Sequence, residues 1–462
     1  MKQHLSEATF NTTENSLFYR TPIKNPHQLK SAHRPPTESP SSHQFFPYLY
    51  QMKFSDYNFD PKVKRGLEKL GFRRPTDIQF KSIPNILKGE DLLAVAQTGT
   101  GKTAAFAIPI VDLIYEQKQK ERRPTGAKCI VLVPTHELAL QIEDVFQQIT
   151  QFTTVKVMAL IGGVDQEPQI AKLKKRVDIV IATPGRMFDL ISQGHLPTHR
   201  IEILVLDEAD YMLDLGFVKD IEDLIRKLPR RRQTLFFSAT INERIKKTAY
   251  SIVRQNAIRI QLSPKDPVAK KVDHSVLFVE MDHKRFFLER VVKENPDTKI
   301  LVFVRTKVRA ERVSKAMKRA NIDSITIHGD KDQETRSEML DQFRNGAVQL
   351  LIATDITARG IDIPNVEIVV NYDLPVEAEN YVHRVGRTGR ANQKGHAYSF
   401  CAKEEKPVLQ EIQSYLKKEI KVLKIDGTEY VDTLDVEKER KNDYQSLIKE
   451  DEDFQKTRKK RK

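Results

Sequence analysis

From residue 52 to about residue 425, short apolar runs alternate with segments whose apolar residues recur at helical spacing. Runs of three to five residues that are apolar on both faces are typical of parallel strands buried between helices. They are Leu92–Ala96, Ile130–Val133, Ile179–Ala182, Ile203–Leu206 and Leu235–Phe237, then Val276–Val279, Ile300–Val304, Ser324–His328, Leu350–Ala353, Ile368–Asn371 and Ala397–Cys401. This alternation predicts an α/β chain with two parallel sheets in tandem.

Composition shifts divide the chain further. Residues 1–51 are polar and lack an apolar period, which predicts either a disordered extension or a stretch upstream of the true start, because Met52 immediately precedes the first motif. Two prolines without periodicity predict a linker over residues 261–271, between domains at 52–260 and 272–425. Residues 426–462 are expected to form a charged tail with a basic end, either solvated or catching RNA.

Lys and Arg number 77 against 63 Asp and Glu, a formal net charge of +14. This excess favours a polyanionic partner, with nucleic acid first, although solubility alone is an alternative. Two cysteines exclude a disulfide scaffold and fit a reducing compartment, which predicts a cytoplasmic protein. No apolar run reaches the length of a membrane span, so no membrane association is expected.

A glycine-rich loop follows the first predicted strand and precedes an apolar helical segment. Its glycines allow backbone N–H groups to surround phosphates, its lysine supplies a point charge, and its last threonine can ligate Mg²⁺. Ala96 replaces the usual first glycine of this pattern. The expected nucleotide loop comprises Gln97, Thr98, Gly99, Thr100, Gly101, Lys102 and Thr103.

Two carboxylates follow the strand Ile203–Leu206. Asp207 lies where a phosphate-loop fold needs an acid that holds Mg²⁺, partly through water. Glu208 is the candidate base for the attacking water. Acidic residues that merely favour a helix N-terminus are the alternative. The upstream phosphate loop argues for the catalytic interpretation, with Thr103 and Asp207 as the metal-side residues.

Asp207-Glu-Ala-Asp210, together with the phosphate loop, resembles the signature of the DEAD-box family of ATP-dependent RNA helicases, in superfamily 2. Phe54 before Gly71–Gln79, Ser238-Ala-Thr240 and His383–Arg390 resemble further motifs of that family, in the family's order. The compact core most resembles the bacterial RhlE-like branch. The resemblance implies two tandem RecA-like domains separated by a crevice for nucleotide and RNA.

For the nucleotide, the resemblance implies that Phe54 stacks on the base beside Phe72, that Thr76 supports the loop, and that Asp362 faces the ribose. Gln79 can read adenine because its amide carries both a donor and an acceptor, although a buried structural glutamine is the alternative. The resemblance also implies that Arg387 and Arg390 are arginine fingers, that His383 couples the phosphate and RNA sites, and that Ser238 and Thr240 link hydrolysis to strand separation.

For RNA, the resemblance implies contacts mostly to the backbone, with weak sequence preference. The implied residues are Pro134, Thr135, Gly162, Gly163, Thr183, Pro184, Gly185 and Arg186 in the first domain, and Arg305, Thr306, Gln333, Arg336, Thr354, Asp355 and Gly360 in the second. His136 departs from the family's usual arginine, which weakens a phosphate contact or removes a structural ion pair.

The implied activity is ATP hydrolysis with Mg²⁺, stimulated by RNA, that unwinds or remodels short RNA duplexes. A monomer is expected, with ribosomal or RNA-decay proteins as candidate partners. Two alternatives stay open: an ATP-gated RNA clamp without productive unwinding, and a DNA-directed helicase of the same two-lobed architecture.

Overall fold

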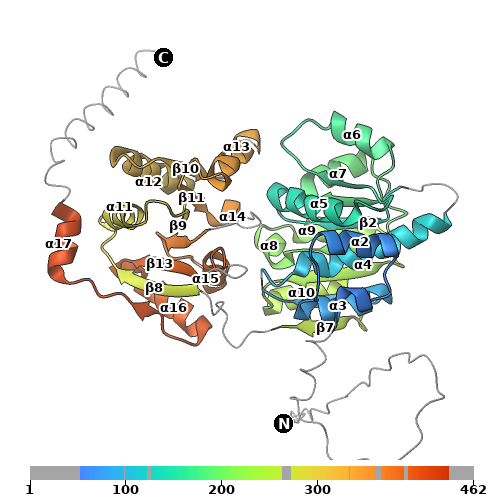
Figure 1. Cartoon of the computed structure of the whole chain (residues 1–462), viewed down its shortest axis with the longest axis horizontal. Coiled ribbons are helices and arrows are strands. Elements are labelled where there is room, and N and C mark those ends of the chain that lie inside the picture. Colours follow the sequence, from blue (N-terminus) through green and yellow to red (C-terminus); the bar gives the residue numbers. More distant parts are fainter. Residues whose placement is uncertain are drawn as a thin grey trace, which may run out of the picture. The chain divides into compact units, whose positions relative to one another are not determined.

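The computed structural model describes residues 52–97, 99–121, 126–262, 272–331, 333–358, 366–389 and 394–435 (Figure 1). The predicted N-terminal extension, most of the predicted linker and the end of the predicted tail lie outside these ranges. Within them, the helices and strands form two parallel sheets of seven strands, each with its own helices. The predicted α/β fold with tandem parallel sheets is therefore confirmed.

The first sheet has the order β3-β4-β2-β5-β6-β1-β7, and neighbouring strands pair in parallel. In chain order its strands are β1 (Leu92–Val95), β2 (Cys129–Leu132), β3 (Val157–Leu160), β4 (Ile179–Ala182), β5 (Ile203–Leu206), β6 (Gln233–Ser238) and β7 (Ile258–Gln261). Since all carboxyl ends meet at one edge, the loops that follow these strands lie in the same row.

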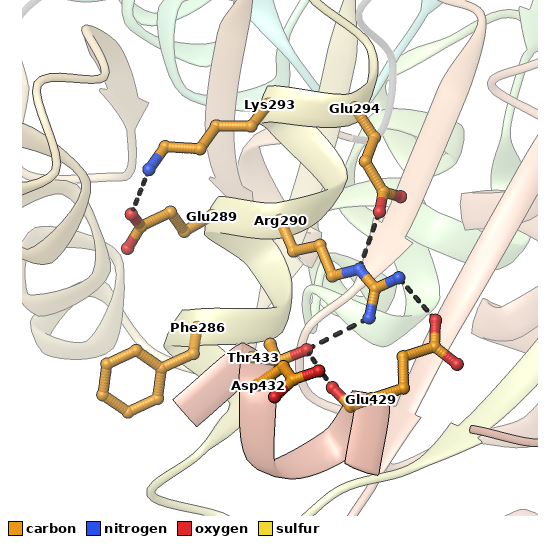
Figure 2. A pocket seen from close by; sticks show the side chains of 8 residues that line it. All are labelled: Phe286, Glu289, Arg290, Lys293, Glu294, Glu429, Asp432 and Thr433. Atoms are coloured by element: carbon orange, nitrogen blue, oxygen red, sulfur yellow. Dashed lines mark hydrogen bonds and ion pairs between the residues drawn. The ribbon is translucent and has the colours of Figure 1, made fainter. Parts of the chain in front are cut away.

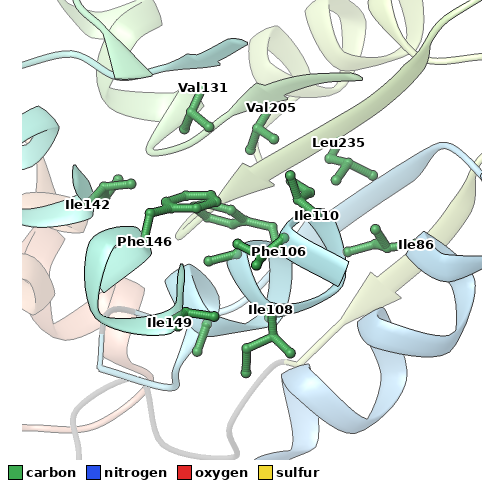
Figure 3. Close-up of a cluster of buried hydrophobic side chains, with 14 of the residues drawn as sticks. Ile86, Phe106, Ile108, Ile110, Val131, Ile142, Phe146, Ile149, Val205 and Leu235 are labelled. Atoms are coloured by element: carbon green, nitrogen blue, oxygen red, sulfur yellow. The ribbon is translucent and has the colours of Figure 1, made fainter. Parts of the chain in front are cut away.

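Helices cover both faces of this sheet, and alternate residues of each strand enter two apolar clusters. On β5, Ile203 and Val205 join the cluster of α3, α4 and α5, whose packing Figure 3 shows around Phe106 and Phe146. Leu204 joins the opposite cluster, with α7 to α10. The elements are η1 (Phe54–Asp56), α2 (Pro61–Lys69), α3 (Asp77–Leu87), α4 (Lys102–Lys120), α5 (His136–Thr150), α6 (Glu167–Lys174), α7 (Pro184–Ser192), α8 (Ala209–Asp214), α9 (Val218–Lys227) and α10 (Glu243–Ile252).

The second sheet has the order β10-β11-β9-β12-β13-β8-β14, again with parallel pairs. Its strands are β8 (Val272–Phe278), β9 (Ile300–Val304), β10 (Ser324–Ile327), β11 (Leu350–Thr354), β12 (Ile368–Asn371), β13 (Gly395–Cys401) and β14 (Lys421–Val422). One face carries α11 (Lys284–Glu294) and α12 (Lys307–Arg319). The other carries α13 (Gln333–Arg344), α15 (Ala378–Val385) and α16 (Lys406–Leu416), while α14 (Asp355–Ala358) follows β11 and η2 (Lys403–Glu405) follows β13.

The segment expected to begin the charged tail contains one more helix, α17 (Gly427–Asp435), which packs on α11. Tyr430 of α17 bonds His283 Nδ1 at 3.0 Å, and its ring lies 5.0 Å from that of Phe287. Figure 2 shows Arg290 of α11 contacting α17 beside a cavity of about 350 Å³. Folded structure therefore extends past residue 425, to residue 435.

Every predicted strand is present, with bounds that differ by a few residues. Three strands that the pattern did not predict, β3, β7 and β14, lie at sheet edges. In the described part of the chain, no helix is both long and apolar enough to cross a bilayer.

Candidate active site

The order of the first sheet brings the predicted nucleotide motifs together. The phosphate loop follows β1, the two carboxylates follow β5, and Ser238–Thr240 completes and follows β6, which lies between those two strands. The predicted RNA loops follow β2, β4 and β3 in the same row, on the far side of β5. One sheet edge therefore carries a nucleotide half and an RNA half that meet at β5.

The phosphate loop turns from β1 into the N-terminus of α4 through two glycines with positive φ. Gly99 has φ 80° and Gly101 has φ 92°, conformations that side-chain-bearing residues rarely adopt. Thr100 Oγ1 donates to the carbonyl of Gln97 at 2.8 Å and closes the loop. Backbone N–H groups at a helix N-terminus bind anions, so the loop suits phosphates.

Lys102, at the start of α4, is 7% exposed, and its Nζ atom is buried with no hydrogen-bond partner among the described residues. Across from it, Asp207 is 3% exposed. Burial raises the pKa of Asp207 to about 6, and the positive charge of Lys102 opposes that shift. A buried ammonium without a partner is costly, so the residues present fit a bound polyphosphate.

Glu208 lies between β5 and α8 with a left-handed backbone, φ 48° and ψ 47°. Its N–H donates to Asp207 Oδ1 at 2.9 Å, and it is partly exposed whereas Asp207 is buried. A left-handed glutamate costs about 1–2 kcal/mol, and such strain is common at functional sites.

Asp210, which the motif contains but which the sequence did not single out, joins the carboxylate motif to Ser238–Thr240. Its Oδ2 accepts from Ala239 N–H at 3.1 Å, Thr240 N–H at 3.0 Å and Thr240 Oγ1 at 3.0 Å. Ser238 Oγ donates to the Thr240 carbonyl at 2.6 Å. These hydrogen bonds connect the loop after β6 to the carboxylate motif after β5.

Gln79 occupies a structural position. Its amide oxygen accepts from Thr76 N–H at 2.9 Å, and its amide nitrogen donates to the Gly101 carbonyl at 3.1 Å. The residue is 3% exposed. Gln79 is therefore a buried structural glutamine, the alternative that the sequence left open. Its two hydrogen bonds join the adenine motif to the phosphate loop. An amide can form more than two hydrogen bonds, so the adenine contact stays a prediction.

Phe54 is 3% exposed and packs edge-on against Phe72, with ring centroids 5.5 Å apart at 86°. Both residues line a cavity of about 570 Å³. Lys53, Arg73 and Arg74 also line it, so this cavity has aromatic walls and a basic rim. Stacking of Phe54 on a base stays a prediction.

The RNA loops of the first sheet contain capped helix starts. Thr135 Oγ1 accepts from Leu138 N–H at 3.3 Å and caps α5, after the buried Pro134. Thr183 occupies the N-cap position of α7, before Pro184 and Gly185, but its buried Oγ1 makes no capping bond and has no partner among the described residues. Arg186 Nη2 donates to the Val164 carbonyl at 2.6 Å, next to the Gly162–Gly163 turn.

His136 opens α5 beside that turn. A Cβ atom added at Gly162 would lie 3.5 Å from His136 Nε2, so the imidazole packs close to the glycine pair. The departure from the family's arginine therefore falls where two of the predicted RNA loops approach each other.

In the second sheet, the predicted RNA residues follow β9, β10 and β11, which are neighbours. Thr306 caps α12 through its Oγ1, Thr354 ends β11, and Arg336 lies on α13. Gln333 begins α13, but its side chain lies outside the described residues. Gln333 and Arg336 therefore belong to the same helix.

Two of the predicted RNA residues also have partners within the protein, and their RNA contacts stay predictions. Asp355 accepts a bidentate pair of hydrogen bonds from Arg384, at 2.5 Å and 2.7 Å. The Arg305 guanidinium lies 3.4 Å from the Leu374 carbonyl and 3.5 Å from Glu405 Oε1. The structure therefore gives both side chains a role within the second sheet domain.

Arg384, which the sequence did not identify, is 2% exposed and holds the arginine motif in place. Besides Asp355 it donates to the Asp373 carbonyl at 2.6 Å and stacks on the Phe303 ring. Arg387 follows in the next turn and is 5% exposed, and His383 lies on α15. The remaining predicted site residues, Thr98, Gly360, Asp362 and Arg390, lie outside the described residues.

Family models match both halves of this arrangement. Residues 76–248 match the DEAD/DEAH box helicase model, and residues 283–392 match the helicase conserved C-terminal domain. Together these matches contain the phosphate loop, the carboxylates, Ser238–Thr240 and the arginine motif.

Curated relatives and solved structures agree. The chain is 38% identical over 379 residues to ATP-dependent RNA helicase DbpA of Bacillus subtilis, covering 82% of this chain and 78% of the relative. It is 38% identical to RhlB of Xanthomonas oryzae, covering 81% and 66%. Dbp5 of S. cerevisiae bound to RNA and ADP BeF3 superposes with a TM-score of 0.73 at 30% identity, covering 83% and 98%. The chain belongs to the DEAD/DEAH box helicase family, and its two sheets are the tandem RecA-like domains of that family.

Proposed function

We propose that this chain hydrolyses ATP and uses the hydrolysis to separate or remodel short RNA duplexes, the activity of the RNA helicases that it resembles. The proposal rests on the buried Nζ atom of Lys102, which has no hydrogen-bond partner among the described residues. This ammonium lies at a helix N-terminus, and a bound anion would compensate its charge. The similar fold of S. cerevisiae Dbp5, solved with bound RNA and ADP BeF3, supports it. The RhlE-like branch stays a proposal.

The nucleotide half divides its tasks among few side chains. Lys102 and the N–H groups of the glycine loop hold the phosphates, and Thr103 with Asp207 would hold Mg²⁺, whose charge would neutralise the phosphate oxygens. Glu208, one residue beyond Asp207, orients and deprotonates the attacking water. Asp210 connects this carboxylate motif to Ala239 and Thr240 through its three hydrogen bonds, so a change at the carboxylates can reach the loop after β6.

Arg387 and Arg390 complete the site from the second RecA-like domain. A planar guanidinium neutralises charge that grows on the γ-phosphate in the transition state. Arg384, clamped to Asp355 at the end of β11, sets the position of this motif relative to the predicted RNA residue Thr354. We infer that RNA contact at the end of β11 affects the positions of Arg387 and Arg390 through the Arg384–Asp355 pair. This link supports stimulation of hydrolysis by RNA.

RNA crosses the loops of β2, β3 and β4 in one domain and those of β9, β10 and β11 in the other. The buried Thr183 Oγ1 and Arg186 Nη1, neither of which has a partner among the described residues, support a polar ligand at the first row. The chain's two cysteines are buried free thiols, in keeping with a cytoplasmic location. A monomeric state and ribosomal or RNA-decay partners are further expectations, testable by light scattering and native affinity capture.

The function is tested with two variants of the nucleotide half. Lys102→Ala should lose ATP binding because the phosphate charge is removed, whereas Glu208→Gln should retain ATP binding and lose turnover because only the base is changed. ATPase activity is measured with RNA and with DNA of equal length, and strand displacement is measured alongside. Normal turnover in Glu208→Gln contradicts the assignment, DNA stimulation equal to RNA favours a DNA helicase, and RNA-gated binding without displacement favours a clamp.

A further inference from the structure

The helix α12 carries an unusual concentration of positive charge. Its thirteen residues include six Lys or Arg and a single acid, Glu311. Two of the six cations are used inside the domain: Lys307 pairs with Asp330 at 2.7 Å and Arg309 with Asp373 at 3.0 Å. The other four, Arg312, Lys315, Lys318 and Arg319, are exposed and form no hydrogen bond or ion pair with any described residue.

These four cations share one side of the helix. Arg312, Lys315 and Arg319 are spaced by three and four residues, so they lie on one face, and Lys318 flanks them. Ala310, Val313 and Met317 occupy the opposite face and are buried against the sheet. From Arg312 to Arg319 the face extends about 10 Å along the helix axis. We name the four side chains the α12 cationic face.

The α12 cationic face is unfavourable for the folded helix. Lys315 has three like-charged neighbours at helical contact distance, Arg312, Lys318 and Arg319, and such pairs are destabilising. Lys318 and Arg319 are favourable beside the helix C-terminus, but Arg312 and Lys315 lie too far from it to gain this benefit. A bound polyanion would remove the repulsion, whereas solvent alone only screens it.

The position of α12 indicates which polyanion reaches it. The helix starts directly after Thr306, at the carboxyl end of β9, where the predicted RNA row of this domain lies. From that edge it runs back across β10 and β11 on the face shared with α11 (Figure 1). An RNA strand that crosses Thr306 and continues past the sheet edge therefore meets Arg312 first and Lys315 one turn later.

We propose that the α12 cationic face binds the phosphates of single-stranded RNA flanking the segment held by the family motifs. The proposal rests on the RNA-binding function proposed above and adds a second contact region that reads no bases. Its effect is to raise the affinity for long RNA over short RNA without changing the chemistry of ATP hydrolysis.

The test uses the full chain and fluorescent oligouridylates of two lengths, one covered by the motif loops and one extended by a dozen or so nucleotides. Arg312→Gln/Lys315→Gln should weaken binding of the long RNA and leave the short RNA unchanged. For two lost phosphate contacts, the slope of log affinity against log salt should decrease by about 1.4. The deficit should then shrink about sevenfold between 50 and 200 mM salt. The matched control is Lys421→Gln/Lys424→Gln, two exposed lysines by β14 at the opposite edge of the same sheet.

Lys315→Glu separates ligand binding from helix stability. It converts three repulsive helix pairs into attractive ones and one attractive pair, with Glu311, into a repulsive one. The thermal unfolding temperature should therefore stay equal or rise, while long-RNA affinity falls further than in the glutamine variant. An unchanged salt slope for long RNA, or equal losses for both lengths, overturns the proposal. If RNA fails to stimulate the wild-type ATPase, the proposed function fails, which is a separate outcome.

Discussion

Lys284→Met removes a buried positive charge from α11 while keeping the length and most of the volume of the side chain. Lys284 is fully buried, and its Nζ donates to Glu405 Oε2 at 2.5 Å and to the Tyr372 carbonyl at 2.7 Å. Asp373 Oδ1 lies 3.9 Å away. Burial lowers the pKa of Lys284, and the Glu405 carboxylate opposes this shift, so the ammonium is retained by its partners.

The magnitude follows from what the substitution leaves behind. Removing one partner of a buried ion pair costs about 3–5 kcal/mol when the other charge is left without compensation. Glu405 keeps the Ala402 N–H at 3.0 Å and the Leu374 N–H at 3.3 Å, which places the cost at the lower end of that range. We expect a loss of about 3 kcal/mol in the free energy of unfolding of the second sheet domain.

The assay is hydrogen exchange of peptides from β12 and β13, followed by mass spectrometry, because a two-domain chain does not give one unfolding transition. A loss of about 3 kcal/mol corresponds to roughly 10²-fold faster exchange through opening of this domain. The matched control is Lys293→Met on the same helix, whose Nζ lies 2.7 Å from Glu289 with the lysine 53% exposed (Figure 2). That surface pair should contribute no more than about 0.5 kcal/mol.

Equal exchange rates in Lys284→Met and Lys293→Met would refute the reasoning, since burial is the main difference between the two sites. A double substitution sharpens the result. If the pair is the cause, Lys284→Met/Glu405→Gln should cost clearly less than the sum of its single substitutions, because the second change removes the charge that the first leaves uncompensated.

Arg387→Ala should bind ATP with a near-normal dissociation constant and lower turnover about 10³-fold, as removal of an arginine finger does, while a large rise in dissociation constant with normal turnover would show a ground-state ligand. Gly101→Ala should abolish ATP binding in a nucleotide titration, because φ is 92° and the added Cβ would lie 2.4 Å from Gln79 Nε2; retained binding would contradict the tight approach. Burial raises the pKa of Asp112 to about 6 from 3.8, although its bond from Asp60 N–H opposes this, so the folded chain binds more protons and stability falls as pH rises from about 4 to 6. Asp112→Asn should therefore stabilise the first domain by up to about 2–3 kcal/mol at pH 8 and by little at pH 4, measured by urea unfolding, and a gain independent of pH would contradict the cause.

The central strands of both sheets could be predicted from the sequence because they are covered on both faces. Residues in β2 and β5, for instance, are buried along their whole length, which produces an unbroken apolar run. The missed strands lie at edges: β3 alternates between buried and half-buried residues, and both residues of β14 are exposed. The side chains of these edge strands are only partly covered, so they do not form an unbroken apolar run.

The sequence alone determined the chemistry whose residues are neighbours along the chain. The phosphate loop needs only consecutive residues after a strand, and the two carboxylates follow a single strand, so these motifs could be recognised without coordinates. The same locality allowed the family resemblance to be drawn from short motifs in their order.

Only the tertiary structure decided which charged and polar side chains meet. Asp355 is held by Arg384 at a separation of 29 residues, Gln79 is bonded to Gly101 at a separation of 22, and Lys284 meets Glu405 across 121 residues. Such pairs depend on the order of strands in the sheet, which brings distant carboxyl ends to one edge. Because residue type does not show which partners a side chain has, the sequence could not predict that Asp355 pairs with Arg384 or that Arg305 lies beside Glu405.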